Sequence, residues 1–598
     1  MRVLVTWTLA LTLLALPAMA GKDGAKDDGK ADKNTSAATK KDDATDAKNK
    51  TAATSKTDST AKPEASSTEI ELQHLRDLLE SQAKQIQEQS EQLKAQQLQM
   101  QAMQDQLKIM STANALPLAV TPGTNGAPAS ADATPQYEAQ EKEKKTEPPT
   151  TIHIKGITIT PGGFLAAESV WRSHALSADV NTPFNAIPFS GGSNGHVSEW
   201  NPSARQSRIS LRAEGKADNV TFTGYYETDW LAAAVTSNNN ESNSYVLRQR
   251  QIWGQAEFQN GFKFTAGQMW SLVTETRSGV ENTKETPPLT IDAQYNVGFS
   301  WARQLGLRVS KKFADHYWLA MSVESPQATF VAHNPPANFL LGAAGNGGGL
   351  FNTLANYSFN VAPDIIVKGV AEPGWGHYEL FGIFSFFRDR VYPNAPATAG
   401  AFNDTRGAGG IGANARVPLF KKKLDVGVHF LAGDGIGRYG TVGLQDVTVR
   451  PNGTLAPIRG GQALGTVEWH VTPMFDLYTY VGGEYEERAF FNTIVAGKTV
   501  SVGYGSPLFD NSGCNTEALG TGFVPGSPSH CTGDTRNVIE GTIGFWHRLY
   551  KGNRGTIQWG PQYSYVVRNT WSGVNGAKQA APHAVENMVL TSFRYILP

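Results

Sequence analysis

The sequence predicts an all-β protein: a transmembrane antiparallel β-barrel of about 16 strands, preceded by an N-terminal α-helical coiled coil. Three observations predict this class. Short segments of alternating hydrophobicity recur from residue 151 onward, separated by Gly-, Pro- and Asn-rich stretches. A heptad repeat precedes them. The composition, with 60 Gly and 10% aromatic residues, suits many strands and turns, and no apolar run after residue 20 could cross a bilayer as a helix.

The first 20 residues have the pattern of a secretory signal peptide. Arg2 precedes an apolar segment at residues 3–16, and the sequence A-M-A at residues 18–20 is a small-residue cleavage site. We therefore expect an exported protein whose mature chain begins at Gly21. An uncleaved anchor helix is the alternative, and the short apolar segment disfavours it.

Residues 21–68 consist largely of Lys, Asp, Ala and Thr, with almost no large apolar side chain. Such a tract buries nothing that would offset the entropy of ordering it, so we expect disorder. A solvated spacer is the simpler interpretation, although the charges could also contact cell-wall polymer.

Residues 69–110 carry a seven-residue repeat. This spacing places the apolar positions on one stripe of a helix, which predicts a coiled-coil stalk about 60 Å long at 1.5 Å per residue. Gln occupies three successive positions of the second seam, which indicates a defined oligomer without choosing between two and three strands. Residues 111–150 contain several Pro and form a linker. The first seam positions are Leu72, Leu79, Ile86, Leu93, Met100 and Leu107.

The remaining residues, 151–598, are expected to form the barrel. In the clearest segment, 219–230, Phe222 and Tyr226 share one face while Glu227 and Asp229 share the other. An apolar outer face with a charged inner face is typical of a barrel in lipid, because a soluble barrel needs an apolar interior. The expected strands are 163–172, 205–214, 219–230, 245–258, 261–270, 299–311, 317–324, 364–371, 377–388, 407–419, 424–432, 461–470, 474–484, 537–549, 556–568 and 587–597.

Two of these segments depart from clean alternation. Segment 245–258 places Arg248 and Arg250 on the same face as Phe258, so either a bulge shifts the parity or the strand leaves the bilayer after Arg250. The closing segment 587–597 has an inner face that mixes Arg594 with apolar residues. That mixture fits a loop folded inside the barrel, or a reversed parity.

The connections between segments alternate between short turns and long Gly/Asn/Pro-rich loops, and many Trp and Tyr lie near strand ends. Short periplasmic turns, long external loops and aromatic girdles are features of outer-membrane barrels. A soluble all-β array such as a propeller is the alternative, but the sequence has no blade repeat.

The interior charges are the candidate functional residues. Arginines in a narrow channel attract anions and hold carboxylates bidentately. The alternative is that they pair with Glu214, Glu227, Asp229 and Glu540 as a solvated lining, and the sequence leaves both interpretations open. Parity assigns to the lumen Arg208, Arg212, Arg248, Arg250, Arg308 and Arg568.

The long loop 271–296 is a candidate to fold inward as a constriction, with Arg277, Glu281 and Lys284 as its charged residues. The two cysteines, Cys514 and Cys531, are expected to form a disulfide in an oxidising compartment, worth about 3 kcal/mol by loop entropy.

Several other functions are disfavoured. The net charge of -1 and the absence of a basic stripe exclude a nucleic-acid partner. A G-x-S-x-G match at 191–195 and a G-x-G-x-x-G match at 407–412 lack the strand and helix context that catalysis or cofactor binding requires. No enzyme activity, cofactor or metal site is therefore expected, because no His, Cys or carboxylate cluster has metal-ligand spacing.

Five stretches, together with the heptads, resemble the DcaP-like porins, a family of trimeric outer-membrane channels with an N-terminal periplasmic coiled coil. The resemblance implies a Gram-negative outer-membrane homotrimer, with its stalk in the periplasm, that passively admits small, mainly anionic solutes such as dicarboxylates. Its surroundings would be outer-membrane lipid and lipopolysaccharide. The stretches are 163–165 (GFL), 205–211 (RQSRISL), 247–251 (LRQRQ), 264–268 (FTAGQ) and 301–304 (WARQ).

Two alternatives remain. A sugar-specific porin of the maltoporin or sucrose-porin kind would show a luminal path of stacked aromatic rings. An envelope tether, in which the barrel mainly anchors the stalk, would conduct little or nothing.

Overall fold

The computed structural model describes residues 151–232, 245–341, 361–517 and 530–598. The predicted signal peptide, charged tract, coiled-coil stalk and linker lie outside these residues. None of the helices in the described part of the chain has the length and apolarity needed to cross a bilayer.

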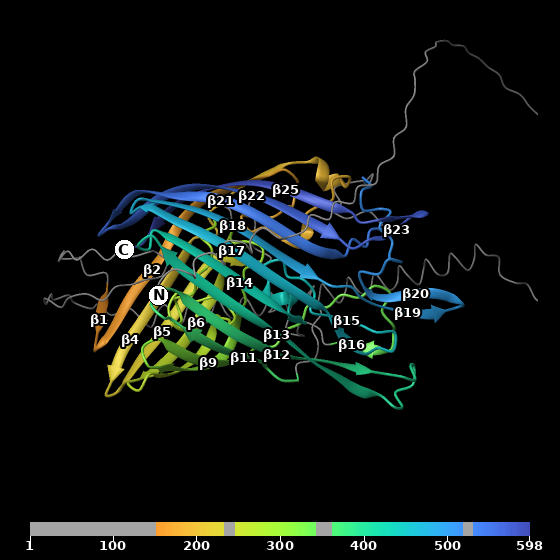
Figure 1. The fold of residues 1–598 in the computed structure, drawn as a ribbon, viewed down its shortest axis with the longest axis horizontal. Coiled ribbons are helices and arrows are strands. Elements are labelled where there is room, and N and C mark those ends of the chain that lie inside the picture. The colour runs from red at the N-terminus through yellow and green to blue at the C-terminus, as the bar shows by residue number, and fades with distance from the viewer. Residues whose placement is uncertain (1–150, 233–244, 342–360, 518–529) are drawn as a thin grey trace, which may run out of the picture. The chain divides into compact units, whose positions relative to one another are not determined.

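The described residues contain sixteen long antiparallel strands joined into one closed ring (Figure 1). Each strand pairs with its neighbours along the chain, and β2 pairs with both β4 and the last strand, β25, which closes the ring. The strands are β2 (Ile157–Arg172), β4 (Arg208–Ala217), β5 (Val220–Ala232), β6 (Val246–Phe258), β7 (Phe262–Trp270), β8 (Arg303–Phe313), β9 (Tyr317–Glu324), β11 (Asp364–Ala371), β12 (His377–Val391), β13 (Phe402–Leu419), β14 (Leu424–Asp434), β17 (Arg459–Thr472), β18 (Phe475–Glu486), β21 (Thr535–Gly552), β22 (Gly555–Thr570) and β25 (His583–Ile596).

Every predicted strand segment overlaps one of these sixteen strands, so the predicted antiparallel barrel is confirmed. The structure extends several of them: β13 begins at Phe402 where the pattern indicated residue 407, and β21 runs on to Gly552. Strand β8 is shorter at its start, because residues 299–302 belong to the preceding loop.

The smaller elements lie in the connections. β1 (Ile152–Ile154), β3 (Glu199–Ser203) and β10 (Phe339–Leu340) add short pairings to the ring, and three 3-10 turns, η1 (Phe184–Ala186), η2 (Ser193–His196) and η3 (Gly437–Tyr439), lie in long loops. Three hairpins lie toward the long-loop end: β15 (Val447–Val449) with β16 (Leu455–Pro457), which is buried, β19 (Ala489–Val495) with β20 (Lys498–Tyr504), and β23 (Gly573–Asn575) with β24 (Lys578–Ala580).

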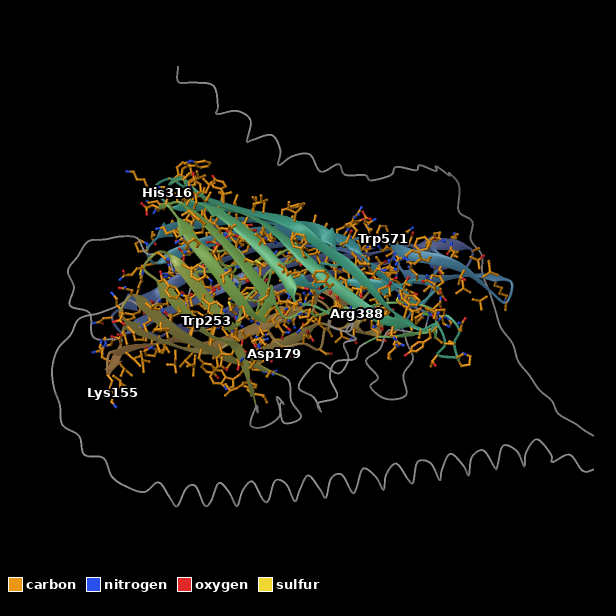
Figure 2. All side chains as sticks on the ribbon, turned by 90° about the horizontal axis from the view of Figure 1, so that it is seen from below. Lys155, Asp179, Trp253, His316, Arg388 and Trp571 are labelled. Carbon is orange, nitrogen blue, oxygen red and sulfur yellow. A yellow bond between two sulfur atoms is a disulfide. The ribbon has the colours of Figure 1, made fainter. Side chains whose placement is uncertain are left out.

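The two ends of the barrel differ as predicted. Short turns gather at one end, together with the C-terminal end of β25, and the hairpins gather at the other (Figure 1). His316, in the turn between β8 and β9, and Trp571, in the loop after β22, lie at these opposite ends (Figure 2). This asymmetry is that of short periplasmic turns and long external loops.

Alternation sorts the side chains of each strand between two faces. In β5, Phe222 and Tyr226 are exposed on the outside while Thr223, Tyr225 and Glu227 are buried inside. Exposed Leu, Ile, Phe and Trp recur on the outer face of most strands, where lipid would cover them.

Of the two explanations that the sequence left open for segment 245–258, a bulge or an early exit from the bilayer, the structure shows a β-bulge in β6. Glu227 pairs with Gln251 but the next residue, Thr228, pairs with Gln249, so Arg250 is the extra residue. An extra residue shifts the alternation by one. The bulge therefore keeps Arg248 and Arg250 inside the barrel while Ile252 lies outside.

The interior contains an apolar core as well as charges. Buried residues of the first long loop, including Phe184 and Ile187, and of the loop after β7, including Ile291, pack with Met588 and Leu590 of β25. The mixed inner face of the closing strand is thus explained by loops folded into the lumen, and its parity is not reversed.

Candidate functional site

The loop that follows β7 crosses the lumen. Its backbone amides donate hydrogen bonds to carboxylates and an amide that project inward from β9, β12, β18, β21 and β22. Because these strands lie around much of the ring, the loop is held from several sides. The bonds are Leu272 to Glu324 (2.9 Å), Thr276 to Glu379 (2.9 Å), Ile291 to Gln562 (2.5 Å), Val297 to Glu540 (2.8 Å) and Gly298 to Glu484 (3.0 Å).

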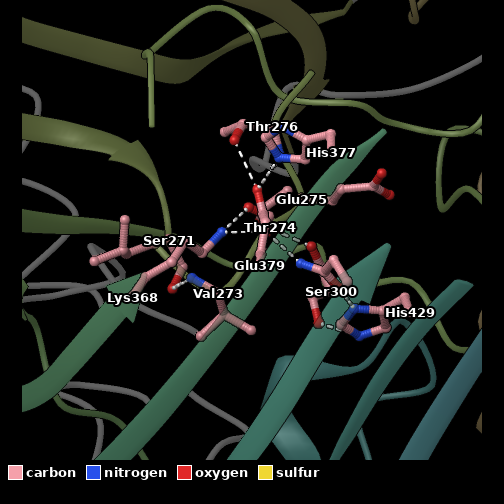
Figure 3. Close-up of polar contacts among 12 residues, drawn as sticks. Ser271, Val273, Thr274, Glu275, Thr276, Ser300, Lys368, His377, Glu379 and His429 are labelled. Carbon is pink, nitrogen blue, oxygen red and sulfur yellow. Dashed lines mark hydrogen bonds and ion pairs between the residues drawn. The ribbon is translucent and has the colours of Figure 1, made fainter. Parts of the chain in front are cut away.

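A polar cluster on β11, β12 and β13 fixes the start of this loop (Figure 3). Lys368 Nζ, fully buried, donates to Glu379 Oε2 at 2.6 Å and to the Thr274 carbonyl at 2.8 Å. His377 Nε2 lies 2.9 Å from Glu379 Oε1, and Asn414 Nδ2 donates to Glu379 Oε2. Glu379 therefore binds both the barrel wall and the loop, and its carboxylate balances the charge of Lys368.

The predicted charged residues of the loop have separate surroundings. Glu281 accepts two hydrogen bonds from Lys263 Nζ of β7, at 2.6 and 2.5 Å. Arg277 and Lys284 are joined through their backbones, where the Arg277 amide donates to the Lys284 carbonyl at 2.6 Å. All three side chains are partly buried. The contact between Glu281 and Lys263 fastens the loop to β7.

Four of the predicted luminal arginines lie on β4 and β6 and face carboxylates of the same wall. Arg250 Nε and Nη1 contact Glu227 and Asp229 at 2.6 and 2.9 Å, and Arg248 Nη2 contacts Asp229 at 2.7 Å. Arg208 is 3.9 Å from Glu227. These pairings match the interpretation of the arginines as part of a neutralised lining. Arg212 pairs in the same way with Glu214, at 2.8 Å.

The other two predicted arginines bind loop atoms. Arg308 of β8 donates to Asn282 Oδ1 and to the Trp270 carbonyl, both at 2.6 Å. Arg568 of β22 donates to the carbonyls of Ile187 and Gly533 near the external end. The six predicted arginines therefore do not meet at one point of the lumen. Glu540, expected as a partner for arginines, binds the loop instead.

A cavity of about 80 Å3 lies beneath the luminal loop, on the side of the short turns. Three arginines line it, Arg208, Arg548 and Arg594, against a single lining carboxylate, Asp476. Arg548 pairs with Asp476, and Arg594 pairs with Glu168 at 2.8 Å. The other lining residues are Phe164, Gln206, Pro287, Pro288, Leu289, Thr290, Tyr295, Trp546, Gln558 and Ile596.

Arg548 and Arg594 were not among the predicted site residues, although alternation in segments 537–549 and 587–597 puts both on the inner face. The guanidinium of Arg594 lies over the rings of Phe164 and Trp546, 4.7 and 4.8 Å from their centroids. Such stacking orients a guanidinium and leaves its edge for polar partners. The two arginines reach the same cavity because the ring closes, and no local sequence pattern predicts that closure.

Burial and charge shift the pKa values of three groups in the luminal loop. Burial raises the pKa of Glu285 to about 7 and also raises that of Asp292. Burial opposes ionisation of Tyr295 as well, but the guanidiniums of Arg250, Arg208 and Arg303 outweigh it and lower the Tyr295 pKa to about 8. The loop therefore carries groups that can change charge near neutral pH.

The external loops are tied to one another. Cys514 and Cys531 form a disulfide in the long loop between β18 and β21. His333 Nε2 lies 2.7 Å from Asp534 Oδ1, which joins the loop after β9 to the same region. Both cysteines of the chain are thus used, and the described residues contain no free thiol.

A closed antiparallel ring with apolar side chains outside and charged side chains inside defines a β-barrel of the outer-membrane type. No protein-family model matches the chain, and no curated protein matches it either. Solved structures do resemble it. The outer-membrane channel DcaP of Acinetobacter baumannii has 14% identity and a TM-score of 0.48, and the match covers 74% of this chain and 98% of that one.

Two further matches are outer-membrane OmpT of Vibrio cholerae and an anion-selective porin from Comamonas acidovorans. OmpT has 10% identity and a TM-score of 0.38, covering 75% of this chain and 99% of that one. The Comamonas porin has 8% identity and a TM-score of 0.38, covering 74% and 100%. At such values the likenesses carry no information on solute or mechanism.

Proposed function

We propose that the protein is an outer-membrane porin, and not an enzyme, through which small anionic solutes such as dicarboxylates diffuse passively. The observation that carries this proposal is the cavity beneath the luminal loop, where three arginines face one carboxylate. Arginines that line a narrow, poorly screened passage raise the local concentration of anions.

The partners of these arginines suit transient binding. Arg548 and Arg594 each meet a carboxylate, and the Nε atoms of Arg208 and Arg548 are buried without a hydrogen-bond partner. A passing carboxylate or phosphate would bind these guanidiniums from the cavity that they line. Because Asp476 and Glu168 compete for two of the three guanidiniums, a bound anion would also leave easily, which conduction requires.

We further propose a homotrimer in the Gram-negative outer membrane, with residues 69–110 as a periplasmic coiled-coil stalk. The heptad repeat supports this arrangement, as does the gathering of the short turns at the end of the barrel where β2 begins. Deleting residues 69–110 tests the stalk. An unchanged trimer on native gels would show that the barrel surface suffices for assembly.

Planar-bilayer conductance under a salt gradient tests the anion preference. The double variant Arg548→Gln, Arg594→Gln should lower the anion-to-cation permeability ratio, because each lost charge is worth about 1 kcal/mol at contact in water, or roughly fivefold. Arg388→Gln, on the outward parity of β12, is the matched control and should leave the ratio unchanged. A cation-selective wild type would refute the anion proposal, and no conductance at all would favour the envelope tether.

A sugar-specific porin is the second candidate, because the rings of Phe164, Tyr295 and Trp546 line the same cavity. Aromatic faces bind the apolar faces of sugars, whereas arginines bind anions. Block of the salt current by maltodextrin or sucrose, abolished by Phe164→Ala and indifferent to Arg548→Gln, would support the sugar porin over the anion channel.

A further inference from the structure

Three metal-ligating side chains meet on the luminal wall near the short-turn end of the barrel. Asp425 is the second residue of β14, and Glu468 lies directly opposite it on β17. His470, two residues further along β17, projects to the same inner face. One ligand atom from each residue lies within 4.8 Å of the other two.

The orientation of His470 is set by a carboxylate on the next strand. His470 Nδ1 lies 2.8 Å from Asp476 Oδ1 on β18, and Asp476 is in turn held by Arg548. With the Nδ1–H group donating a hydrogen bond to this carboxylate, Nε2 is the nitrogen that a metal ion would bind, in place of the proton through which Nε2 bonds to Asp425. Nε2 faces Asp425, 3.7 Å from Oδ2. A carboxylate that fixes the second ring nitrogen is the usual outer partner of a metal-bound histidine.

The carboxylate of Glu468 has an incomplete set of partners. Its Oε1 accepts a hydrogen bond from the Tyr480 hydroxyl at 2.9 Å, and Arg416 Nη1 lies 3.8 Å away. Its Oε2 atom is buried without a hydrogen-bond partner, and the residue is 1% exposed. A buried carboxylate oxygen without a donor is unfavourable, and a cation would remove that cost.

We propose that Asp425, Glu468 and His470 bind one divalent transition-metal ion, of which Zn2+ is the best match. One imidazole and two carboxylates are ligands that Zn2+ accepts, and water in the lumen would complete a tetrahedral shell. Ligand atoms about 2.1 Å from Zn2+ lie about 3.4 Å apart, so the three side chains close by roughly 1 Å on binding. Rotation about side-chain torsions covers that distance without moving the strands.

This site escaped the sequence patterns because its third ligand comes from another strand. Glu468 and His470 are two residues apart, which puts both on one face of β17, but Asp425 is supplied by the register between β14 and β17. The proposal does not depend on which solute the channel admits, because Zn2+ binding is measured without any solute present.

Isothermal titration of the purified full-length protein in detergent with ZnCl2 at pH 7.5 tests the site. We expect one saturable site per chain, and at least a tenfold loss of affinity in each of Asp425→Asn, Glu468→Gln and His470→Gln. The matched control is His547→Gln, an exposed residue on the outward face of β21 opposite Phe475, which should bind Zn2+ as the wild type does.

Heat-modifiable migration on gels verifies that each variant retains a folded barrel. If His470→Gln does not fold, Asp425→Asn decides the matter alone, because it leaves the His470 and Asp476 pair intact. Co2+ gives a second readout: visible d–d bands should appear with the wild type and disappear with Asp425→Asn. Absence of saturable binding, or binding that survives both Asp425→Asn and Glu468→Gln, would overturn the proposal.

Discussion

Two stretches of the luminal wall carry arginines, but they use them differently. On β5 and β6, which we call the paired wall, Arg248 and Arg250 face Glu227 and Asp229, two cations against two carboxylates. On β21 and β25, which we call the cavity wall, Arg548 and Arg594 line an open space. Each of them also pairs with a carboxylate, Arg548 with Asp476 and Arg594 with Glu168, but only Asp476 lines that space with them.

The difference shows that the number of luminal arginines does not set the field that a solute meets. Arg250 is 2% exposed and pairs with both Glu227 and Asp229, so these carboxylates balance its charge. In the cavity wall, Arg548 has one donor atom, Nε, without a hydrogen-bond partner. The paired wall therefore serves stability, and the cavity wall serves the proposed passage.

The largest expected effect is the loss of the buried cation in the paired wall. Arg250→Met leaves Glu227 and Asp229 buried with fewer partners, so we expect the free energy of unfolding to fall by about 3–5 kcal/mol. Urea unfolding of the barrel in lipid or detergent measures this change. Arg388→Met on the outer face should stay within about 0.5 kcal/mol of the wild type. A loss below about 1 kcal/mol for Arg250→Met would mean that the two walls do not differ in this way.

A smaller effect is expected from pH, through the luminal loop, whose Tyr295 accepts a hydrogen bond from Arg250 and also lines the cavity. The pKa of Glu285 is raised from 4.5 to about 7 when the loop is docked, so the docked state binds the proton more tightly than the released state. Docking should be strongest below about pH 4.5, weaken as the pH rises to about 7, and then level off, with a total change of at most about 3 kcal/mol.

Hydrogen exchange of residues 271–302, corrected for intrinsic rates, measures this dependence. Protection should be higher at pH 5 than at pH 8 in the wild type, and Glu285→Gln should flatten the profile. Glu487→Gln, an exposed change in another loop, should leave the profile as it is. Higher protection at pH 8 would contradict the assigned direction.

The smallest effect is expected at Arg208, which lies on β4 between the paired carboxylates and the cavity. It is 3.9 Å from Glu227 and also lines the cavity, so Arg208→Gln should cost about 1 kcal/mol or less in unfolding. It should still lower anion selectivity in bilayers. A stability loss as large as that of Arg250→Met would assign Arg208 to the paired wall alone.

Alternation alone predicted much of the barrel. Each strand needs one face for lipid and one for the lumen, so the period of two marks the strands, and a break in it marked the bulge at Arg250. The inward position of the predicted arginines follows from the same rule. The partners of those arginines do not, because Arg308 and Arg568 meet loop atoms whose positions depend on the whole interior.

The contacts that the sequence patterns did not predict join residues that lie far apart in the chain. Arg208, Arg548 and Arg594 share a cavity only because the ring closes. Asp425 and Glu468 share a register across two strands that a long loop separates. Lys368 was not recognised as an anchor, since nothing local indicates that a loop carbonyl from Thr274 will reach it.

The contact between Arg594 and Glu168 joins residues 426 positions apart, across the seam between the first and last barrel strands. Contacts of such long sequence separation form late, because the intervening chain must be ordered first. We therefore expect the arginine-lined cavity to be complete only when the first and last strands have paired. A half-inserted barrel would hold most of its strands and still lack the proposed solute site, so charge selectivity in a bilayer would report on completed folding as well as on the proposed transport.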